Sequence, residues 1–373
     1  MNNTITTLDN STLEPLEAVD GQAQFTCDGC GECCNRWTIP IDADKVDALL
    51  QKPWVRDLLD KHRKQFEPTG DGLYTVPHAL GNVCIFLSPE KRCMIECEEG
   101  AALKPTECIR YPFATTQDQL ENFYFDSSAS CKRIAEHLIM DTFLPVVPPV
   151  IDEVLRSDVE ILPEKIRVSP FRKMKTKDVL SEWDVMVRNT LQTPNMNSLE
   201  VLGHLENHLF FSRPARTRYN HAPWWLPFFL RKPYGMWSLW QILTGQAYHD
   251  PSLWGLPVNL RAVAAVVLPP EEEHHIKSFV HQILTRKRLL TRGASLQSLI
   301  ALSIIAIHLV HWHAKILAVL NAAPNGTDDP ITVDKKDISL AIRLVERYYT
   351  GHQPRFLVPF TNPLWSWFLL HVL

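Results

Sequence analysis

The sequence has few of the features that mark nucleotide-binding and nucleic-acid-binding proteins. Glycine accounts for only 14 of the 373 residues. Neither GxGxxG nor the P-loop pattern GxxxxGK(S/T) occurs, so neither a Rossmann dinucleotide site nor a P-loop is expected. The 42 acidic residues slightly outnumber the 38 basic ones, which gives a formal net charge of −4. The strongly basic balance of a nucleic-acid-binding protein is therefore absent, and we expect no nucleic-acid partner.

Basic residues are missing from the beginning of the chain, and cysteines from most of the remainder. No Lys or Arg precedes Arg36, so the sequence lacks the basic start of a secretory signal and the Arg-rich face of a transit peptide. We therefore expect a cytoplasmic protein. All nine cysteines lie between Cys27 and Cys131. In a reducing compartment, such a cluster favours metal ligands over disulfides.

The composition is that of a globular protein, with 45% hydrophobic and 21% charged residues, and the length predicts two domains. Residues 1–24 are polar and acidic and are expected to form a flexible leader. Three prolines between 145 and 149 predict a boundary between domains over 25–144 and 150–373. The predicted fold class is mostly α: a small irregular Cys-rich metal-binding domain with short strands, followed by a helical domain.

Periodic patterns predict several elements. Helices are expected after Asp42 and after Pro53, each with one apolar face, and an amphipathic helix over 335–349. The stretches 73–76 and 84–87 have the composition of short strands. Residues 88–91 have that of a turn, and 325–330 that of a surface loop.

One segment, 294–314, carries no formal charge over a length that would span a bilayer. It nevertheless contains serines, a glutamine and the histidines His308, His311 and His313, and such side chains are costly in hydrocarbon. We therefore expect the buried central helix of a soluble bundle and no membrane span. The histidines are expected to be satisfied core or boundary residues.

The strongest chemical signal is the run Cys27-x2-Cys30-x2-Cys33-Cys34. A spacing of two residues lets a tight loop direct successive thiolates at one centre, and the intervening glycines allow the turns between them. Thiolates favour zinc, copper(I) or iron–sulfur clusters over hard ions such as magnesium. The CxxCxxC portion also matches three of the ligands in a bacterial ferredoxin loop. This part of the chain is therefore predicted to bind a metal.

More cysteines follow, at Cys84, Cys93, Cys97, Cys108 and Cys131. Two zinc sites of four thiolates each, or a four-iron cluster with thiols left for a second centre, would both fit this number. The ferredoxin-like spacing favours an iron–sulfur cluster, with zinc as the alternative. The adjacent thiols of Cys33 and Cys34 are not expected to bind one ion together. Cys34 would then reach a second centre or act as a redox thiol.

The order and spacing of these cysteines resemble a known family. The CxxCxxCC run, then Cys84 and Cys93, then Lys104-Pro105-x2-Cys108, then Cys131-Lys132-Arg133, is similar to the zinc- or iron-chelating cysteine-cluster (CxxCxxCC, YkgJ-type) proteins. The resemblance covers residues 25–135, and Cys97 has no counterpart in the family pattern. It implies metal ligands at Cys27, Cys30, Cys33, Cys34, Cys84, Cys93, Cys108 and Cys131.

Two further patterns resemble the flagellin lysine-N-methylase branch of that superfamily. They are Cys33-Cys34-x2-Trp37-x-Ile39-x-Ile41-Asp42 and Cys93-x6-Gly100-x7-Cys108-x2-Tyr111-Pro112, followed by a long Cys-free part. The branch implies methyl transfer from S-adenosylmethionine to lysines of another protein, with an iron–sulfur cluster present. S-adenosylmethionine is thus expected from the resemblance alone. No catalytic or cofactor-binding residue is assigned.

Weaker patterns are interpreted as structural. His204 and His208 are spaced to clip a metal from one helix face, but an exposed face is predicted because the glutamate of an HExxH motif is missing. Tryptophans between 224 and 254 are predicted to pack helices. The basic runs 172–177 and 286–288 are predicted to be solvated faces, either of which would suit an acidic protein.

The combined prediction is a cytoplasmic metal-cluster-binding protein, with a 4Fe-4S cluster in first place, that modifies or matures another protein. Two alternatives remain. One is a zinc-stapled protein-interaction module without catalysis. The other is an electron-transfer or redox-sensing protein.

Overall fold

The structure is a computed structural model that divides the chain into two compact units. Unit 1 comprises Met1–Ala114, Cys131–Arg133 and Pro145–Val159, and unit 2 comprises Thr115–Ser130, Ile134–Leu144 and Glu160–Leu373. The residues it describes are 25, 27, 29–34, 39–79, 83–139, 154–156, 159–169, 171–193, 196–210, 247–249, 257–322 and 331–347. Helices dominate these stretches, and short strands form small sheets. The predicted mostly-α class is confirmed.

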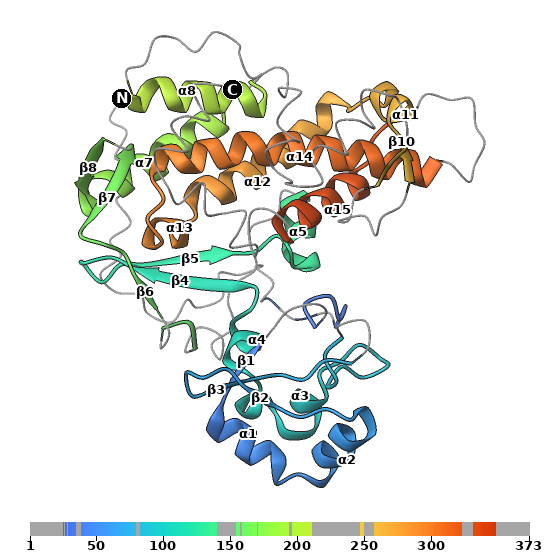
Figure 1. The fold of residues 1–373 in the computed structure, drawn as a ribbon. Coiled ribbons are helices and arrows are strands. Elements are labelled where there is room, and N and C mark those ends of the chain that lie inside the picture. Colours follow the sequence, from blue (N-terminus) through green and yellow to red (C-terminus); the bar gives the residue numbers. More distant parts are fainter. Residues whose placement is uncertain are drawn as a thin grey trace, which may run out of the picture. The chain divides into compact units, whose positions relative to one another are not determined.

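Unit 1 combines short helices with a three-stranded antiparallel sheet (Figure 1). Strands β1 (Pro40–Asp42), β2 (Glu67–Pro68) and β3 (Leu73–Thr75) lie in the order β1–β3–β2. The helices are α1 (Ala43–Leu50), α2 (Pro53–His62), α3 (Met94–Glu99) and α4 (Thr106–Arg110), with the 3-10 turn η1 (Ala101–Leu103) between the last two. The helices predicted after Asp42 and Pro53 and the strand predicted at 73–76 are confirmed.

The hydrophobic core of unit 1 lies between this sheet and its helices. It contains Ile39, Ile41, Val46, Leu49, Val55, Leu59, Phe66, Val76, Ile85, Phe86 and Ile95. The ring of Phe86 meets that of Trp54 edge-on and stacks with that of Phe66, in each case with centroids 6.1 Å apart, both favourable aromatic geometries. Three partly buried thiols, those of Cys84, Cys93 and Cys108, pack against the same core. The core therefore fixes the position of these thiols.

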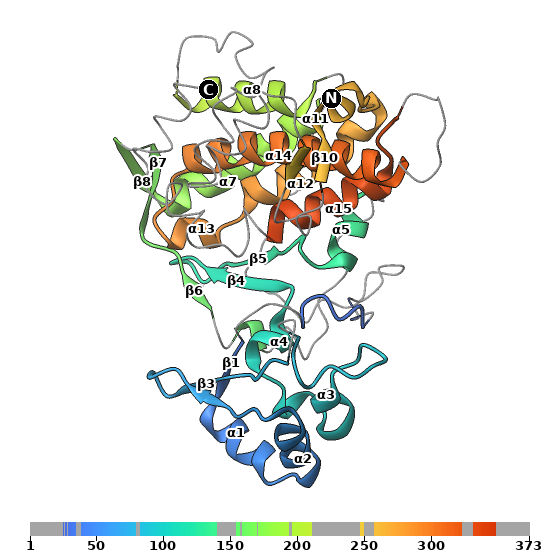
Figure 2. The same ribbon diagram turned by 45° about the vertical axis from the view of Figure 1, so that its right-hand side comes forward.

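Helix α14 (Leu296–Ala322) is the central helix of unit 2. Around it pack α8 (Ser198–Phe210), α11 (Leu260–Ala265), α12 (Glu273–Thr285) and α15 (Lys335–Val345), and α7 (Thr176–Leu191) packs on α8 and α12. Figures 1 and 2 show this arrangement from two sides. A helix that is apolar all round must be covered on all sides, which explains why α14 takes the centre. The helix predicted at 335–349 corresponds to α15.

Within the described residues, α14 is the one helix long and apolar enough to cross a membrane, and 72% of its most apolar stretch is buried inside the protein. His313 is fully buried, with Nδ1 2.8 Å from the carbonyl oxygen of Leu309. Burial lowers the pKa of His308 to about 4, so its imidazole is neutral at pH 7. These features are consistent with the core helix of a soluble protein, as the sequence predicts.

The strands of unit 2 form three small sheets. In the first, β4 (Phe113–Gln117) lies between β5 (Phe123–Ser127) and β6 (Glu160–Ile161), and it runs parallel to β6. The second is the antiparallel hairpin of β7 (Lys165–Ser169) and β8 (Arg172–Lys175), and the third pairs β9 (Ala247–His249) with β10 (Pro257–Asn259). The remaining helices are α5 (Lys132–Ile139), α13 (Arg288–Thr291) and the 3-10 turn η4 (Pro270–Glu272).

The two units are not divided at a single point in the chain, whereas the sequence predicts one boundary at 145–149. Residues 115–130 and 134–144 belong to unit 2 rather than to the cysteine-rich part. The physical reason is strand pairing: Thr116 and Gln117 of β4 pair with Glu160 and Ile161 of β6. The hydrogen bonds of this ladder cannot be predicted from proline content.

The basic run 286–288 lies inside unit 2, so the prediction that it is a solvated face is wrong. Arg286 is 7% exposed and pairs with Glu346 at 2.9 Å. Lys287 is 2% exposed and pairs with Asp184. Arg288 Nε lies 2.6 Å from an oxygen of Glu160. Each of the three cations therefore pairs with a different carboxylate of unit 2.

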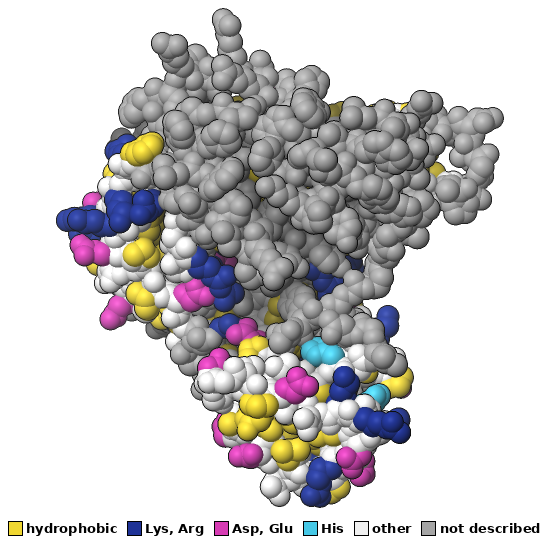
Figure 3. All heavy atoms as spheres, in the orientation of Figure 1, with side chains coloured by type: hydrophobic (Ala, Val, Ile, Leu, Met, Phe, Trp, Pro, Cys, Tyr) yellow, Lys and Arg dark blue, Asp and Glu magenta, His cyan; other side chains and the backbone are white. Residues whose placement is uncertain are grey.

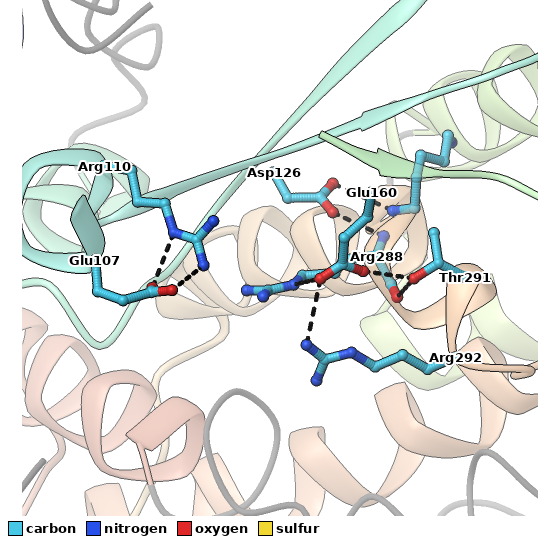
Figure 4. A network of polar contacts seen from close by, with 8 residues as sticks. Glu107, Arg110, Asp126, Glu160, Arg288, Thr291 and Arg292 are labelled. Atoms are coloured by element: carbon cyan, nitrogen blue, oxygen red, sulfur yellow. Dashed lines mark hydrogen bonds and ion pairs between the residues drawn. The ribbon is translucent and has the colours of Figure 1, made fainter. Parts of the chain in front are cut away.

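Figure 4 shows two carboxylates close to this run, those of Asp126 and Glu160, with their partners. Glu160 also accepts a hydrogen bond from the hydroxyl of Thr291 at 2.6 Å. Burial opposes ionisation of Glu160, but Thr291 and Arg288 together hold its pKa below the usual value. The Asp126 carboxylate accepts the backbone N–H groups of Arg288 at 2.9 Å and Lys287 at 3.2 Å, while burial raises its pKa. The network joins β5, β6 and α13.

Candidate metal centre

The CxxCxxCC run turns sharply at its two glycines. Gly29 and Gly31 have φ angles of 66° and 72°, in the left-handed region that glycine adopts without steric cost. The N–H of Cys34 donates to the carbonyl oxygen of Gly31 at 3.2 Å, which closes a turn at the end of the run. A Cβ on Gly31 would lie 3.2 Å from Leu87 Cδ2. The run therefore passes close to the chain around Leu87.

That neighbouring chain, residues 84–93, is a turn followed by a loop, so the strand predicted over 84–87 is wrong. The N–H of Leu87 donates to the carbonyl oxygen of Cys84 at 3.1 Å, and Leu87 forms an antiparallel bridge with Cys93. The apolar residues that predicted a strand, Ile85 and Phe86, turn into the core instead. The turn predicted at 88–91 is confirmed. The result is that Cys84 and Cys93 lie at the two ends of one closed loop.

Backbone hydrogen bonds and a polar anchor hold the cysteine segments in place. The N–H of Cys84 donates to the carbonyl oxygen of Cys34 at 2.8 Å, which joins this loop to the CxxCxxCC run. Cys108 comes from α4. The first residue of α4, Thr106, accepts a hydrogen bond from Lys45 Nζ at 2.8 Å and donates to Asp42 Oδ2 at 3.3 Å. The sheet and α1 thereby position the third segment.

Four thiols from these segments affect one another's ionisation. Burial raises the pKa of Cys108, and the thiolates of Cys84, Cys33 and Cys93 raise it further. Burial likewise raises the pKa of Cys84 to about 12, with contributions from Cys93 and Cys33. Burial raises the pKa of Cys93. The hydrogen bond with Cys34, followed by burial, raises that of Cys33. Through Cys84 and Cys108 the four side chains form one electrostatic group, and all four carry protons at neutral pH.

Lys104 adds a positive charge to this group. Its Nζ donates to Glu96 Oε2 at 2.7 Å. Burial is the largest effect on Lys104 and would lower its pKa, but Glu96 and the thiolates of Cys93 and Cys108 together raise it above the usual value. In return, Lys104 lowers the pKa values of Cys33, Cys93 and Cys108. In the sequence, Lys104 stands out only as part of a spacing pattern, so this role was not predicted.

The thiols of Cys33 and Cys34 lie 4.0 Å apart. Two thiolates on one tetrahedral zinc, each about 2.3 Å from the ion, would be separated by about 3.8 Å. The observed distance is therefore compatible with one shared ion, which the sequence analysis did not expect for adjacent residues.

The other cysteines differ in exposure. Cys27 and Cys97 are exposed, and Cys30 and Cys131 are partly buried. Cys97 lies one helical turn after Cys93 on α3 and outside the predicted ligand set. None of the nine cysteines, all of them among the described residues, forms a disulfide. The ligand roles implied for Cys27, Cys30 and Cys131 stay predictions.

Thiols are suitable ligands for a soft metal, but these thiols lie too far apart to bind one ion together. Burial opposes the ionisation of all four thiols, and neighbouring thiolates add to this at Cys84 and Cys108. A bound cation would supply the missing charge. As they stand, no three Cys, His, Asp or Glu side chains of the described residues are close enough together to hold a metal ion. Binding would therefore draw the thiols together, as expected where metal binding and local folding are coupled.

The weaker candidates have mixed outcomes. His204 lies on α8 and is exposed, as predicted, whereas the side chain of His208 lies outside the described residues. So do the tryptophans at 224–254, the loop at 325–330 and the leader at 1–24. Comparison of the whole chain with models of protein families, with curated proteins and with solved structures found no match.

Proposed function

We propose that unit 1 binds a thiolate-coordinated metal centre through Cys33, Cys84, Cys93 and Cys108. One observation carries this proposal: four partly buried thiols from three chain segments lie together, so that three of them act on the pKa of Cys108, and Cys84, Cys93 and Cys108 pack against one core. Thiols from separate segments that come together in this way are typical of ligands to a common soft metal. Lys104 would offset part of the negative charge of the thiolates.

An iron–sulfur cluster is the first candidate for the metal, because the ferredoxin-like spacing of the CxxCxxC run would let Cys27 and Cys30 join Cys33 as ligands. Zinc is the second. Zinc would take Cys34 as a ligand beside Cys33, since the 4.0 Å between their thiols is about the separation of two thiolates on one tetrahedral ion.

The protein is further proposed to act in the cytoplasm on another protein. The support is the resemblance of the cysteine pattern to the cysteine-cluster family and of the 93–112 pattern to lysine methylases. A bound cluster would supply the redox or ligand-binding chemistry of such an activity. Transfer of a methyl group from S-adenosylmethionine would then be the reaction. A zinc-stapled interaction module and an electron-transfer protein are the competing functions.

The deciding experiment is anaerobic purification of the full chain, followed by analysis of iron, zinc and acid-labile sulfide. Iron with sulfide in equal amounts and a visible charge-transfer absorption would support the cluster. Zinc without sulfide would support the interaction module. A protein that retains neither metal after anaerobic purification, and takes up neither on reconstitution, would refute the metal centre.

Serine variants test the ligand set. We expect Cys84→Ser and Cys108→Ser to lose most of the bound metal, because a serine hydroxyl is a poor substitute for a thiolate ligand. Cys97→Ser is the matched control: this cysteine is exposed and lies outside the group. Metal content, measured per folded protein with circular dichroism as the folding check, gives the answer. Full retention in both Cys84→Ser and Cys108→Ser would exclude the proposed set.

The methylase activity has its own test. Calorimetric titration of S-adenosylmethionine into the anaerobic holo-protein should give binding that disappears in the Cys84→Ser protein. The absence of binding to a protein with an intact centre would leave the two competing functions.

A further inference from the structure

The hairpin of β7 and β8 presents a basic face. Residues 165–177 contain six basic residues and no acidic one. The antiparallel register places Lys165 opposite Lys175 and Arg167 opposite Lys173. Because side chains alternate along a strand, these four lie on one face, while Ile166 and Val168 are buried on the other. In Figure 3, dark-blue side chains gather over this part of the molecule.

Like charges directly opposite each other destabilise a strand pair, and Lys165 and Lys175 are opposed in this way. Within the described residues, no ion pair is formed by Lys165, Arg172, Lys173, Lys175 or Lys177. The other basic run, 286–288, shows the contrast: each of its three cations has its own acid. The charges of Lys165, Arg172, Lys173, Lys175 and Lys177 are therefore available to a partner.

An exposed aromatic side chain lies at the turn of the same hairpin. Phe171 is 76% exposed and immediately precedes β8. Side chains therefore follow one another from the tip of the hairpin towards its base: first Phe171, then Arg172, then the two opposed basic pairs. Lysines on an edge strand can simply prevent aggregation, but that role does not explain an exposed phenylalanine at the tip.

We propose that this hairpin docks on an anionic phospholipid surface. A bilayer is itself ordered by depth, with an apolar region below a layer of negative headgroups. Phe171 would enter the interface, and the basic pairs behind it would meet the headgroups, each basic residue adding to the attraction. A nucleic acid or an acidic protein would be attracted by the charges but requires no such order. The protein would lie on the membrane without crossing it.

The test is co-sedimentation of the full-length protein with vesicles. We expect binding to phosphatidylcholine vesicles that contain about one third phosphatidylserine, and none to phosphatidylcholine alone. Raising NaCl from about 0.1 M to about 0.5 M should release the protein, because exposed charges are screened.

Three variants make the test specific. Lys173→Glu/Lys175→Glu should weaken binding about tenfold or more. The new acids would face Arg167 and Lys165, so the hairpin itself should become more stable, and unfolding cannot explain the loss. Phe171→Ser should weaken binding severalfold at the same net charge. Lys335→Glu/Lys336→Glu makes the same change of charge at exposed positions of α15 and should bind as the wild type does.

Two results would overturn the proposal. One is no binding to the anionic vesicles, or equal binding by the Lys173→Glu/Lys175→Glu protein. The other is capture of a single-stranded oligonucleotide or a polyglutamate peptide in place of the vesicles, which would assign the face to a different polyanion.

Discussion

At the scale of single residues, the thiols of the candidate centre make metal binding depend on pH. Burial raises the pKa of Cys84 to about 12 and also raises those of Cys93 and Cys108. These thiols are therefore protonated at neutral pH, and a metal must displace their protons. Lower pH favours the protons. The apparent zinc affinity, measured by competition with a chelator, should fall steeply between about pH 8 and pH 6.

Lys104 provides the control for this pH dependence. In Lys104→Met, the cation that lowers the thiol pKa values is gone, so the same zinc affinity should require a higher pH. Lys104→Arg keeps the charge and should stay close to the wild type. An affinity that does not change with pH, or that is the same in Lys104→Met and the wild type, would contradict the account of the thiols as one electrostatic group.

Some of the site could be predicted residue by residue. The spacing of the cysteines and the left-handed glycines at positions 29 and 31 follow from local chemistry, since a tight loop of thiolates requires flexible turns. The convergence of Cys33 with Cys84, Cys93 and Cys108, and the position of Lys104 beside them, depends on contacts between distant segments. Those contacts arise from the packing of Ile85 and Phe86 into the core, which spacing alone does not reveal.

At the scale of elements, the two basic runs show where prediction from sequence ends. Both 172–177 and 286–288 are short and basic, so composition predicts two solvated faces. In the structure, β7 and β8 leave the first run exposed, whereas the second lies at the α12–α13 junction, where Glu346 and Asp184 reach it. Helices with a strong apolar period, such as α1 and α15, were predictable because their signal is local.

The Arg286–Glu346 pair should be important for the stability of unit 2. Both side chains are almost fully buried, and Glu346 also accepts a hydrogen bond from Ser128 at 3.1 Å. In Arg286→Met, the Glu346 carboxylate would be left buried without its cation, which should lower the free energy of unfolding by about 3–5 kcal/mol. Urea denaturation followed by circular dichroism measures this loss.

A matched control and a double variant sharpen that measurement. Lys173→Met removes a basic residue from the exposed face and should change stability by no more than about 0.5 kcal/mol. Adding Glu346→Gln to Arg286→Met removes the unpaired charge, so the double variant should lose less than the sum of the two single changes. Equal losses in Arg286→Met and Lys173→Met would show that the buried pair is dispensable.

At the scale of the whole molecule, α14 and the basic hairpin predict different kinds of membrane association. If α14 spanned a bilayer, the apolar faces of α12 and α15 that pack on it would lose their cover. Exposing apolar surface of that extent to water would be strongly unfavourable, so α14 should stay in the core. Any association should then come from exposed charges, which salt screens.

Fractionation of cells that express the full chain distinguishes these two origins. In detergent-free lysate at low ionic strength, we expect the protein to divide between the supernatant and the membrane pellet. About 0.5 M NaCl should release the pelleted part without detergent, and the Lys173→Glu/Lys175→Glu protein should remain in the supernatant throughout. Protein that leaves the pellet only with detergent would mean that α14 enters the bilayer, because removal of an inserted apolar helix depends neither on salt nor on the exposed charges of the hairpin. Release by salt depends on the charges of the hairpin, and release by detergent depends on the apolar surface of α14. One fractionation therefore tests both elements.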